Sequence, residues 1–187
     1  MNKNQINLIT LEGRLVDLTS LLPEDRAELH NLDRQGELLP QMEGLSQRSL
    51  DHQSILPTMF IRTKAKNVVG VIACTEHPDF DNIGIVSLYI DIERCRPGTS
   101  LEAIFLYINA MFSHGAEYIY CEVLEFNWGM LRIFERGNIK PVACLRKHSY
   151  VAGQFWDVYI FTFDKQLWGA IKNIKSYRFW NSLSETQ

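Results

Sequence analysis

The chain has 187 residues, 46% of them hydrophobic and 22% charged, and a formal net charge of -3. This length predicts a single domain that buries about 70% of its unfolded surface. The composition is typical of a globular protein in water. The slightly acidic balance gives no electrostatic basis for nucleic-acid binding.

Cysteine usage and the N-terminus predict a reducing, aqueous compartment. The four cysteines form no C-x-x-C pair and the five histidines show no metal-ligand spacing, so neither a metal site nor a disulfide framework is expected. The opening MNKNQINLIT lacks the apolar core of a signal peptide. No uncharged apolar run reaches the roughly 18 residues that span a membrane. We therefore predict a cytoplasmic protein with no membrane or nucleic-acid partner.

Short strands dominate the predicted elements, which indicates an α+β or mixed α/β domain. The predicted strands are, in chain order, 6–18 (a strand or hairpin), 58–63, 67–74, 83–90, 116–124, 142–150 and 154–163. The predicted helices are 23–32, 99–112 and 128–136, and 37–55 is predicted as loop and broken helix. The tail after Trp168 mixes aromatic and basic residues. It favours a terminal helix that packs Trp168, Phe179 and Trp180 onto the domain over a nucleic-acid or membrane surface.

The segment 91–112 runs from a basic, proline-broken loop into an amphipathic helix. Thr99 and Glu102 have the spacing of a capping box, in which Thr99 would cap the helix with its own hydroxyl. The alternative is an anion site, since the first amides of a helix point outward and Arg94 and Arg96 add positive charge. The preceding strand and the next one would pair through a crossover, which places this loop beyond their carboxyl ends, where ligands commonly bind.

Several unconnected stretches agree with one family in order and spacing. They are Tyr89-Ile90-Asp91, then Gly98 and Glu102-Ala103, the helix start Asn127–Phe134, and the closing VACLRKHSYVAGQFWDVYIFTFDKQLW. In these stretches, and over roughly residues 8–168, the chain resembles the GCN5-related N-acetyltransferase (GNAT) superfamily, in its RimJ/RimL-like ribosomal-protein branch.

This resemblance implies a mixed, mostly antiparallel sheet of about seven strands, splayed between the fourth and fifth. Residues 1–187 would form one acyltransferase domain, with 169–187 as a C-terminal extension. Acetyl-CoA would lie in the splay as co-substrate and pass its acyl group to a primary amine, on a protein N-terminus or a small molecule, by direct attack on the thioester. The implied cofactor-binding residues are Leu88, Ile90, Cys95, Arg96, Pro97, Gly98, Thr99, Ser100, Asn127 and Phe134.

Catalysis is where the chain departs from the family pattern. Phe134 and Met130 stand where relatives carry a tyrosine that protonates the leaving thiolate and a serine. Glu122 falls where relatives that acetylate protein N-termini carry a catalytic glutamate, and a strand carboxylate that faces solvent is the alternative. A nucleophilic role for Cys95 has no neighbouring histidine to support it.

Two other functions therefore stay open beside N-acetylation. One is a non-catalytic module that keeps the fold and binds acyl-CoA or a protein. The other is transfer of a longer acyl group or of one held by an acidic carrier protein, with Arg94 and Arg96 facing the carrier. The oligomeric state is also open, with a homodimer as one option.

Overall fold

The computed structural model describes residues 9–21, 27–28, 32, 56, 58–76, 83–151 and 153–173. Of the predicted helix 23–32, the three described residues 27, 28 and 32 are helical. The predicted loop 37–55 and the tail residues Phe179 and Trp180 lie outside the described residues.

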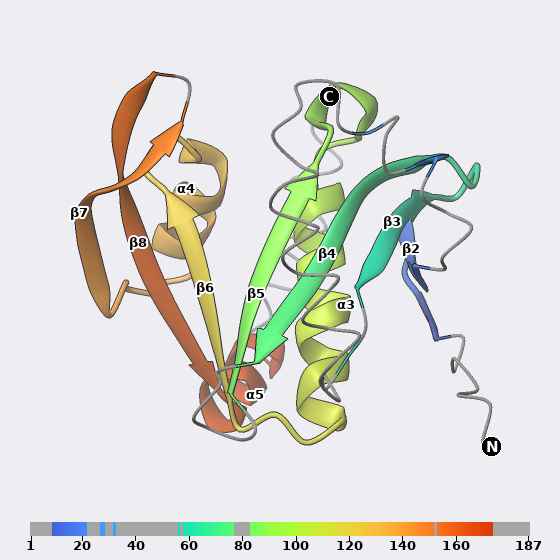
Figure 1. Cartoon of the computed structure of the whole chain (residues 1–187). Coiled ribbons are helices and arrows are strands. Elements are labelled where there is room, and N and C mark those ends of the chain that lie inside the picture. Colours follow the sequence, from blue (N-terminus) through green and yellow to red (C-terminus); the bar gives the residue numbers. More distant parts are fainter. Residues whose placement is uncertain are drawn as a thin grey trace, which may run out of the picture.

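One sheet runs through the whole domain, with strand order β1-β2-β3-β4-β5-β6-β8-β7 (Figure 1). The strands are β1 Thr10–Glu12, β2 Val16–Ser20, β3 Met59–Thr63, β4 Val68–Glu76, β5 Ile83–Ile90, β6 Tyr118–Leu124, β7 Ala143–Val151 and β8 Gln154–Asp164. Of the described pairings, β5 with β6 is parallel and the others are antiparallel. The predicted mixed, mostly antiparallel sheet is confirmed. It has eight strands because the segment predicted as a strand or hairpin forms the hairpin β1–β2.

Three described α-helices and a short 3-10 turn accompany the sheet. They are η2 Ile92–Arg94, α3 Thr99–Ser113, α4 Trp128–Arg136 and α5 Lys165–Asn173. The long helix α3 connects β5 to β6, α4 connects β6 to β7, and α5 follows β8 directly (Figure 1). The boundary predicted at residue 169 therefore falls inside α5, and Ile171 of this helix is buried in the core. None of the described helices is both long and apolar enough to cross a membrane.

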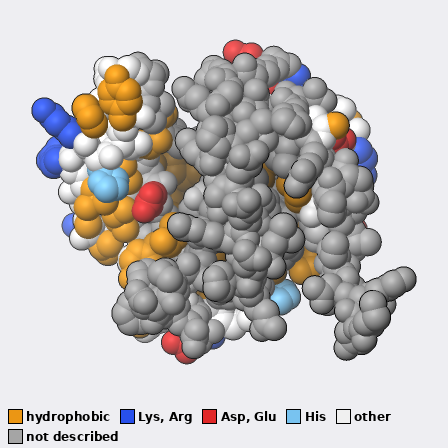
Figure 2. All heavy atoms as spheres, in the orientation of Figure 1, with side chains coloured by type: hydrophobic (Ala, Val, Ile, Leu, Met, Phe, Trp, Pro, Cys, Tyr) orange, Lys and Arg blue, Asp and Glu red, His pale blue; other side chains and the backbone are white. Residues whose placement is uncertain are grey.

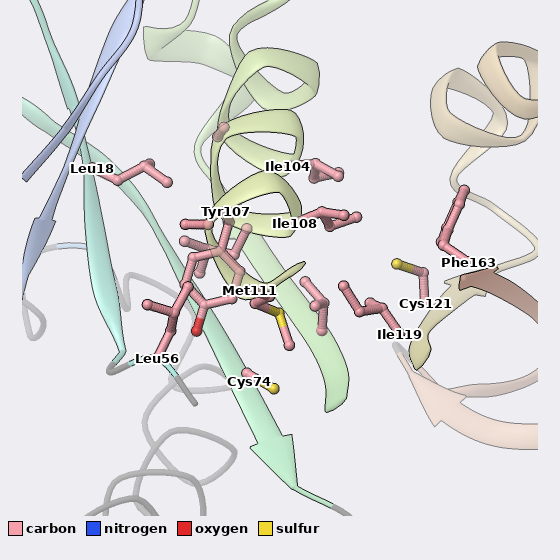
Figure 3. Packing of buried hydrophobic residues seen from close by; sticks show 14 of the residues in the cluster. Leu18, Leu56, Cys74, Ile104, Tyr107, Ile108, Met111, Ile119, Cys121 and Phe163 are labelled. Atoms are coloured by element: carbon pink, nitrogen blue, oxygen red, sulfur yellow. The ribbon is translucent and has the colours of Figure 1, made fainter. Parts of the chain in front are cut away.

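The core lies between α3 and the sheet. Tyr107, Ile108 and Met111 of α3 are fully buried, and Figure 3 shows them between Leu18 on one side and Ile119 on the other. The helical spacing of apolar residues in this segment, Ile108 and Met111 among them, predicted a buried face. Farther along the sheet, the ring of Phe134 in α4 packs on Phe161 of β8, with ring centroids 4.4 Å apart. Both helices are thus fixed to the sheet by apolar contacts, which positions the loops that precede them.

The two halves of the sheet are joined by a short parallel pairing. Only four residue pairs connect β5 and β6, from Ile83 with Tyr118 to Val86 with Cys121. Beyond them β5 continues along β4 to Ile90, while β6 continues along β8 to Leu124. The strands meet at their amino ends and diverge toward their carboxyl ends (Figure 1). The predicted splay between these two strands is therefore present.

A buried acid stabilises the far edge of the sheet and gives a pH-dependent prediction. Asp17 in β2 is 4% exposed and accepts hydrogen bonds from Lys64 at 2.5 Å and Lys66 at 2.9 Å. The hydrogen bond from Lys64 is the main cause that lowers the pKa of Asp17 below its ordinary value of 3.8, although burial opposes it. A lowered pKa stabilises the fold above pH 3.8, and this contribution is lost as pH falls through the folded-state pKa.

We therefore expect Asp17→Asn to lower the melting temperature at pH 7, with the difference from wild type shrinking below pH 3.8. Melting curves between pH 7 and pH 2.5 measure this, with exposed Glu135→Gln as the control. A difference that stays constant across this range would contradict the assignment.

Candidate functional site

The open edge of β5 exposes backbone groups to the splay. Backbone N–H and C=O groups alternate between the two sides of a strand. The Asp91 N–H donates to the Val69 carbonyl at 2.8 Å, so the odd-numbered residues at this end of β5 face β4. The backbone groups of Leu88 and Ile90 then face the opposite side, where no described strand pairs with them. These are the two β5 residues that the sequence predicted as cofactor contacts.

The loop after β5 delivers the N-terminus of α3 to the same end of the sheet. Gly98 is the N-cap of α3, with φ 87° and ψ -11° in the left-handed region, and no side chain caps the helix. The first helical bond runs from the Glu102 N–H to the Gly98 carbonyl. The N–H groups of Ser100 and Leu101 have no acceptor within the described chain. Two such unpaired amides at a helix N-terminus can donate hydrogen bonds to a bound anion.

The predicted capping box is wrong, and its failure is informative. Thr99 is the first residue of α3 and not its cap, so its hydroxyl does not serve as the predicted side-chain cap. Glu102 does not reach back to the cap residue either. Its carboxylate accepts hydrogen bonds from the backbone N–H groups of Arg14 at 2.8 Å, Leu15 at 2.6 Å and Val16 at 2.9 Å. The helix end therefore keeps its own amides available, while Glu102 fixes it to the β1–β2 turn.

The charges on the loop divide between structure and solvent. Arg94 forms an ion pair with Asp91, with 3.3 Å between Arg94 Nε and Asp91 Oδ2. Arg96 is exposed and has no ion-pair partner among the described residues. Arg96 is thus the cation of this loop that could attract an anion from solvent. Pro97, beside it, is also exposed.

The thiol of Cys95 is not activated. Burial is the main cause that raises its pKa from 9.0 to about 11, and the neighbouring Asp91 carboxylate raises it further. Cys95 also packs against the hydrophobic core. A thiol in this environment stays protonated at neutral pH, so it does not act as a nucleophile.

Glu122 lies on the strand that forms the other side of the splay. Its side chain is exposed and alternates with the buried Cys121 and Val123. It therefore points to the face of the sheet opposite the core, beside its cross-strand partner Ile160. Hydrophobic side chains gather over this β6–β8–β7 lobe, with an acidic side chain among them (Figure 2). The carboxylate can reach a ligand from solvent, because no described side chain pairs with it.

Two other acids, Glu125 after β6 and Asp91 after β5, have structural partners. The Glu125 carboxylate accepts a hydrogen bond from the Asp157 N–H at 3.3 Å, and Asp91 is held by Arg94. Of these three carboxylates, Glu122 is therefore the one without a side-chain or backbone partner among the described residues.

The start of α4 combines a cap with a core residue. Asn127 is the N-cap, and its side-chain oxygen accepts a hydrogen bond from the Met130 N–H at 3.2 Å. Its side chain is exposed at the carboxyl end of β6, so its amide NH2 remains available to a ligand. Phe134 is 5% exposed and Met130 is 6% exposed, and both belong to the core. Neither side chain can donate a proton.

Two parts of this site were missed by sequence reasoning. The first is the Leu101 amide, which lies beside the Ser100 amide at the start of α3. The signal that could have identified these two uncapped amides is Gly98, because glycine has no side chain to cap a helix. The tie between Glu102 and the β1–β2 turn joins residues 86 to 88 positions apart, and no local pattern indicates it.

Comparison with known proteins supports the same architecture. No protein-family model matches the chain, and no curated protein sequence is significantly similar to it. Among solved structures, a GCN5-related N-acetyltransferase from Brucella melitensis is 21% identical with a TM-score of 0.67, over 92% of this chain and 85% of that one. The spermidine/spermine N-acetyltransferase SpeG from Vibrio cholerae is 17% identical with a TM-score of 0.67, over 83% of this chain and 96% of that one. RimL, a ribosomal L7/L12 α-N-protein acetyltransferase in complex with coenzyme A, is 12% identical with a TM-score of 0.69, over 85% of this chain and 99% of that one.

These likenesses confirm the fold that the sequence motifs predicted. The chain has the fold of the GCN5-related N-acetyltransferases, with the splay of its sheet and the N-terminus of α3 at the same end.

Proposed function

We propose that this protein is an acyl-CoA-dependent N-acyltransferase that moves an acetyl group from acetyl-CoA to a primary amine. The proposal rests on one observation: two sets of backbone groups that have no partner among the described residues lie at the same end of the sheet. The free edge of β5 at Leu88 and Ile90 matches the amide-containing pantetheine arm. The uncapped N-terminus of α3 matches the pyrophosphate. The solved structures of the same fold are N-acetyltransferases, and one of them holds coenzyme A.

The residues present fit this co-substrate. The N–H groups of Ser100 and Leu101 would hold phosphate oxygens, with the helix dipole adding to the attraction. Arg96 would add a charged contact, while Cys95, Pro97 and Thr99 would shape the loop. The amide NH2 of Asn127, at the other side of the splay, has no acceptor among the described residues. The contact that the resemblance predicts for Phe134 stays a prediction, and this side chain is 5% exposed.

The chemistry needs little from side chains. Bound acetyl-CoA supplies an activated thioester. The chain positions the acceptor amine and a backbone N–H polarises the carbonyl, and such positioning lowers the barrier without a covalent enzyme intermediate. Glu122 takes a proton from the acceptor ammonium, which frees its lone pair for attack. The new C–N bond replaces the C–S bond, and the departing thiolate takes a proton from water, because Phe134 and Met130 have none to give.

The acceptor is a primary amine on a protein N-terminus or on a small molecule. Both kinds occur among proteins of this fold, as RimL and SpeG illustrate by their names. Incubation with acetyl-CoA and a panel of peptides and small amines tests the proposal. Free thiol should appear only when a suitable amine is present. No thiol release with any amine, together with no heat on titration with coenzyme A, would contradict it.

Glu122→Gln is expected to lower kcat by about a hundredfold, which is the usual contribution of a general base. The KM for acetyl-CoA should change little, because the co-substrate binds through backbone groups of other residues. Steady-state kinetics measures both constants. Glu117→Gln, an exposed acid just before β6, is the matched control. Unchanged turnover in Glu122→Gln would show that another group removes the proton.

The placement of Phe134 and Met130 in the core favours one alternative, a module that binds acyl-CoA without turnover. Calorimetry separates the two functions. Binding of coenzyme A with no acyl transfer to any amine would favour the non-catalytic module.

A further inference from the structure

Glu122 lies within a sheet face that three neighbouring strands form, β6, β8 and β7. In the register of these strands, Glu122 is opposite Ile160, and Leu124 is opposite Val158. Val158 is in turn opposite Leu145 of β7. Residues that pair directly, and residues two apart along one strand, put their side chains on the same face of a sheet. Apolar side chains from all three strands therefore lie around the carboxylate that the proposed reaction uses as its base.

This apolar face continues toward the open end of the splay. Leu124 and Ile160 are half-buried, and Leu145 is 37% exposed. Beyond Leu124, at the carboxyl end of β6, the ring of Phe126 packs edge-on against that of Trp156, with centroids 5.0 Å apart. Figure 2 shows hydrophobic side chains gathered over this lobe. A ligand that places a charged group on the Glu122 carboxylate therefore has apolar groups to contact beside it.

The charges on these three strands leave one unbonded carboxylate. Glu122 is the only acid in β6, and β7 has Arg146 and Lys147 but no acid. The two acids of β8 have other bonds. Asp157 accepts hydrogen bonds from the Arg146 side chain at 2.5 Å and the Lys147 N–H at 2.8 Å, and Asp164 accepts one from a backbone N–H of α5 at 2.6 Å. One ammonium group would thus find a carboxylate on these strands, and a second would not.

We propose that the acceptor in the proposed acyl transfer is a peptide N-terminus whose first residue has a bulky apolar side chain. This inference rests on the proposed function and names the substrate class of the same site. The Glu122 carboxylate binds the terminal ammonium and takes its proton, while Leu124 and Ile160 contact the apolar side chain beside it. Polyamines are disfavoured, because strand β7 offers their further ammonium groups two like charges and no carboxylate.

The length of the apolar face favours a peptide over a small amine. Ile160 and Trp156 are four residues apart on β8, which is about 13 Å along the strand. One extended amino acid covers about 3.3–3.6 Å, so leucinamide would contact only the part beside Glu122. A peptide of about four residues matches the whole length, from Glu122 to the aromatic rings at the splay end.

Calorimetric titration of the full chain, with coenzyme A present, tests this inference without turnover. The probes are a short peptide amide that begins with leucine, the same peptide beginning with glycine, leucinamide, and spermidine. The leucine peptide should bind about tenfold more tightly than each of the others, or better. A difference of a few methylene groups against an apolar surface changes affinity by this factor.

Leu145→Glu changes the chemistry of the face at a partly exposed position. It removes an apolar contact and adds a second carboxylate, so it should weaken binding of the leucine peptide about tenfold and tighten that of spermidine. Phe155→Glu is the matched control. Phe155 is on the same hairpin and 61% exposed, but it alternates with Trp156 and points to the opposite face. The same change there should alter neither affinity. Circular dichroism confirms that both variants are folded.

Equal affinities for the leucine and glycine peptides would overturn the inference. So would tighter binding of leucinamide or spermidine, or no binding by any of these probes. Acetylation assays with the same probes address the proposed function separately. Equal acetylation of all the amines would support acyl transfer and overturn the inferred acceptor class. Selective binding of the leucine peptide with no transfer to it would support the inferred surface and contradict the proposed acyl transfer.

Discussion

Gly98→Ala is expected to weaken acetyl-CoA binding about tenfold or more while leaving the protein folded. Gly98 caps α3 with φ 87°, a conformation that costs a residue with a side chain about 1–2 kcal/mol. Rotation of the cap would relieve this strain and turn the Ser100 and Leu101 amides away from their present direction. An added Cβ would lie 3.5 Å from Leu15, an ordinary contact, so steric overlap is not the cause. Calorimetry with coenzyme A measures the loss.

Gly153→Ala is the matched control for this experiment. Gly153 has φ 83° in the turn between β7 and β8, and a Cβ there would meet nothing within 4 Å. It carries the same backbone strain far from the α3 loop in sequence. Both variants should lose similar stability, but only Gly98→Ala should lose affinity. Equal affinity in the two variants would show that the cap of α3 does not position the pyrophosphate.

Glu102→Ala is expected to destabilise the fold by about 3 kcal/mol. Three backbone N–H groups of the β1–β2 turn donate to this one carboxylate, and a hydrogen bond to a charged group contributes about 1.5–3 kcal/mol. The total is less than three such bonds, because the Arg14 N–H is exposed and regains a bond to water. Urea unfolding measures the change.

The graded variant Glu102→Gln distinguishes this mechanism from a general effect of mutation in α3. Glutamine keeps one acceptor oxygen, so about half of the loss is expected. Glu117→Ala, which removes an exposed carboxylate after α3, should change stability by less than about 0.5 kcal/mol. A loss in Glu102→Gln as large as that in Glu102→Ala would mean that the carboxylate charge, and not its acceptor geometry, holds the turn.

The elements best predicted from sequence are those with a strong apolar pattern and clear boundaries. Strand β5 and helix α4 have the predicted bounds, 83–90 and 128–136. In β5 a mostly apolar run ends at Asp91, and α4 begins directly after Asn127, whose side chain caps it. Strand β6 starts two residues later than predicted, because Ala116 is buried in the turn after α3.

The parts of the site that sequence could not predict depend on contacts between distant residues. Thr99 and Glu102 have capping-box spacing whether or not they form one, and the choice is made by the β1–β2 turn, which offers three donors to Glu102. Likewise, the direction of the Leu88 and Ile90 backbone groups is set by the pairing of β5 with β4. In the sequence, Phe134 stands where relatives carry a tyrosine. In the structure, its ring packs against Phe161 and Phe163, a contact that no local pattern indicates.

The four-pair join between β5 and β6 also has a consequence for cooperativity. Strands β1–β5 and strands β6–β8 each have their own ladder of hydrogen bonds, and four residue pairs connect the two ladders, while one apolar core packs against both. The hydrogen bonds of one ladder can open while those of the other stay closed, so the amides of the two ladders would exchange with solvent in two sets of different free energy. A molecule bonded to both diverging strands would act as a ninth strand between them and merge the two sets into one. Its binding would therefore be detected in amide exchange as a change from two sets of free energies to one, which is the pattern of a domain that unfolds as a whole.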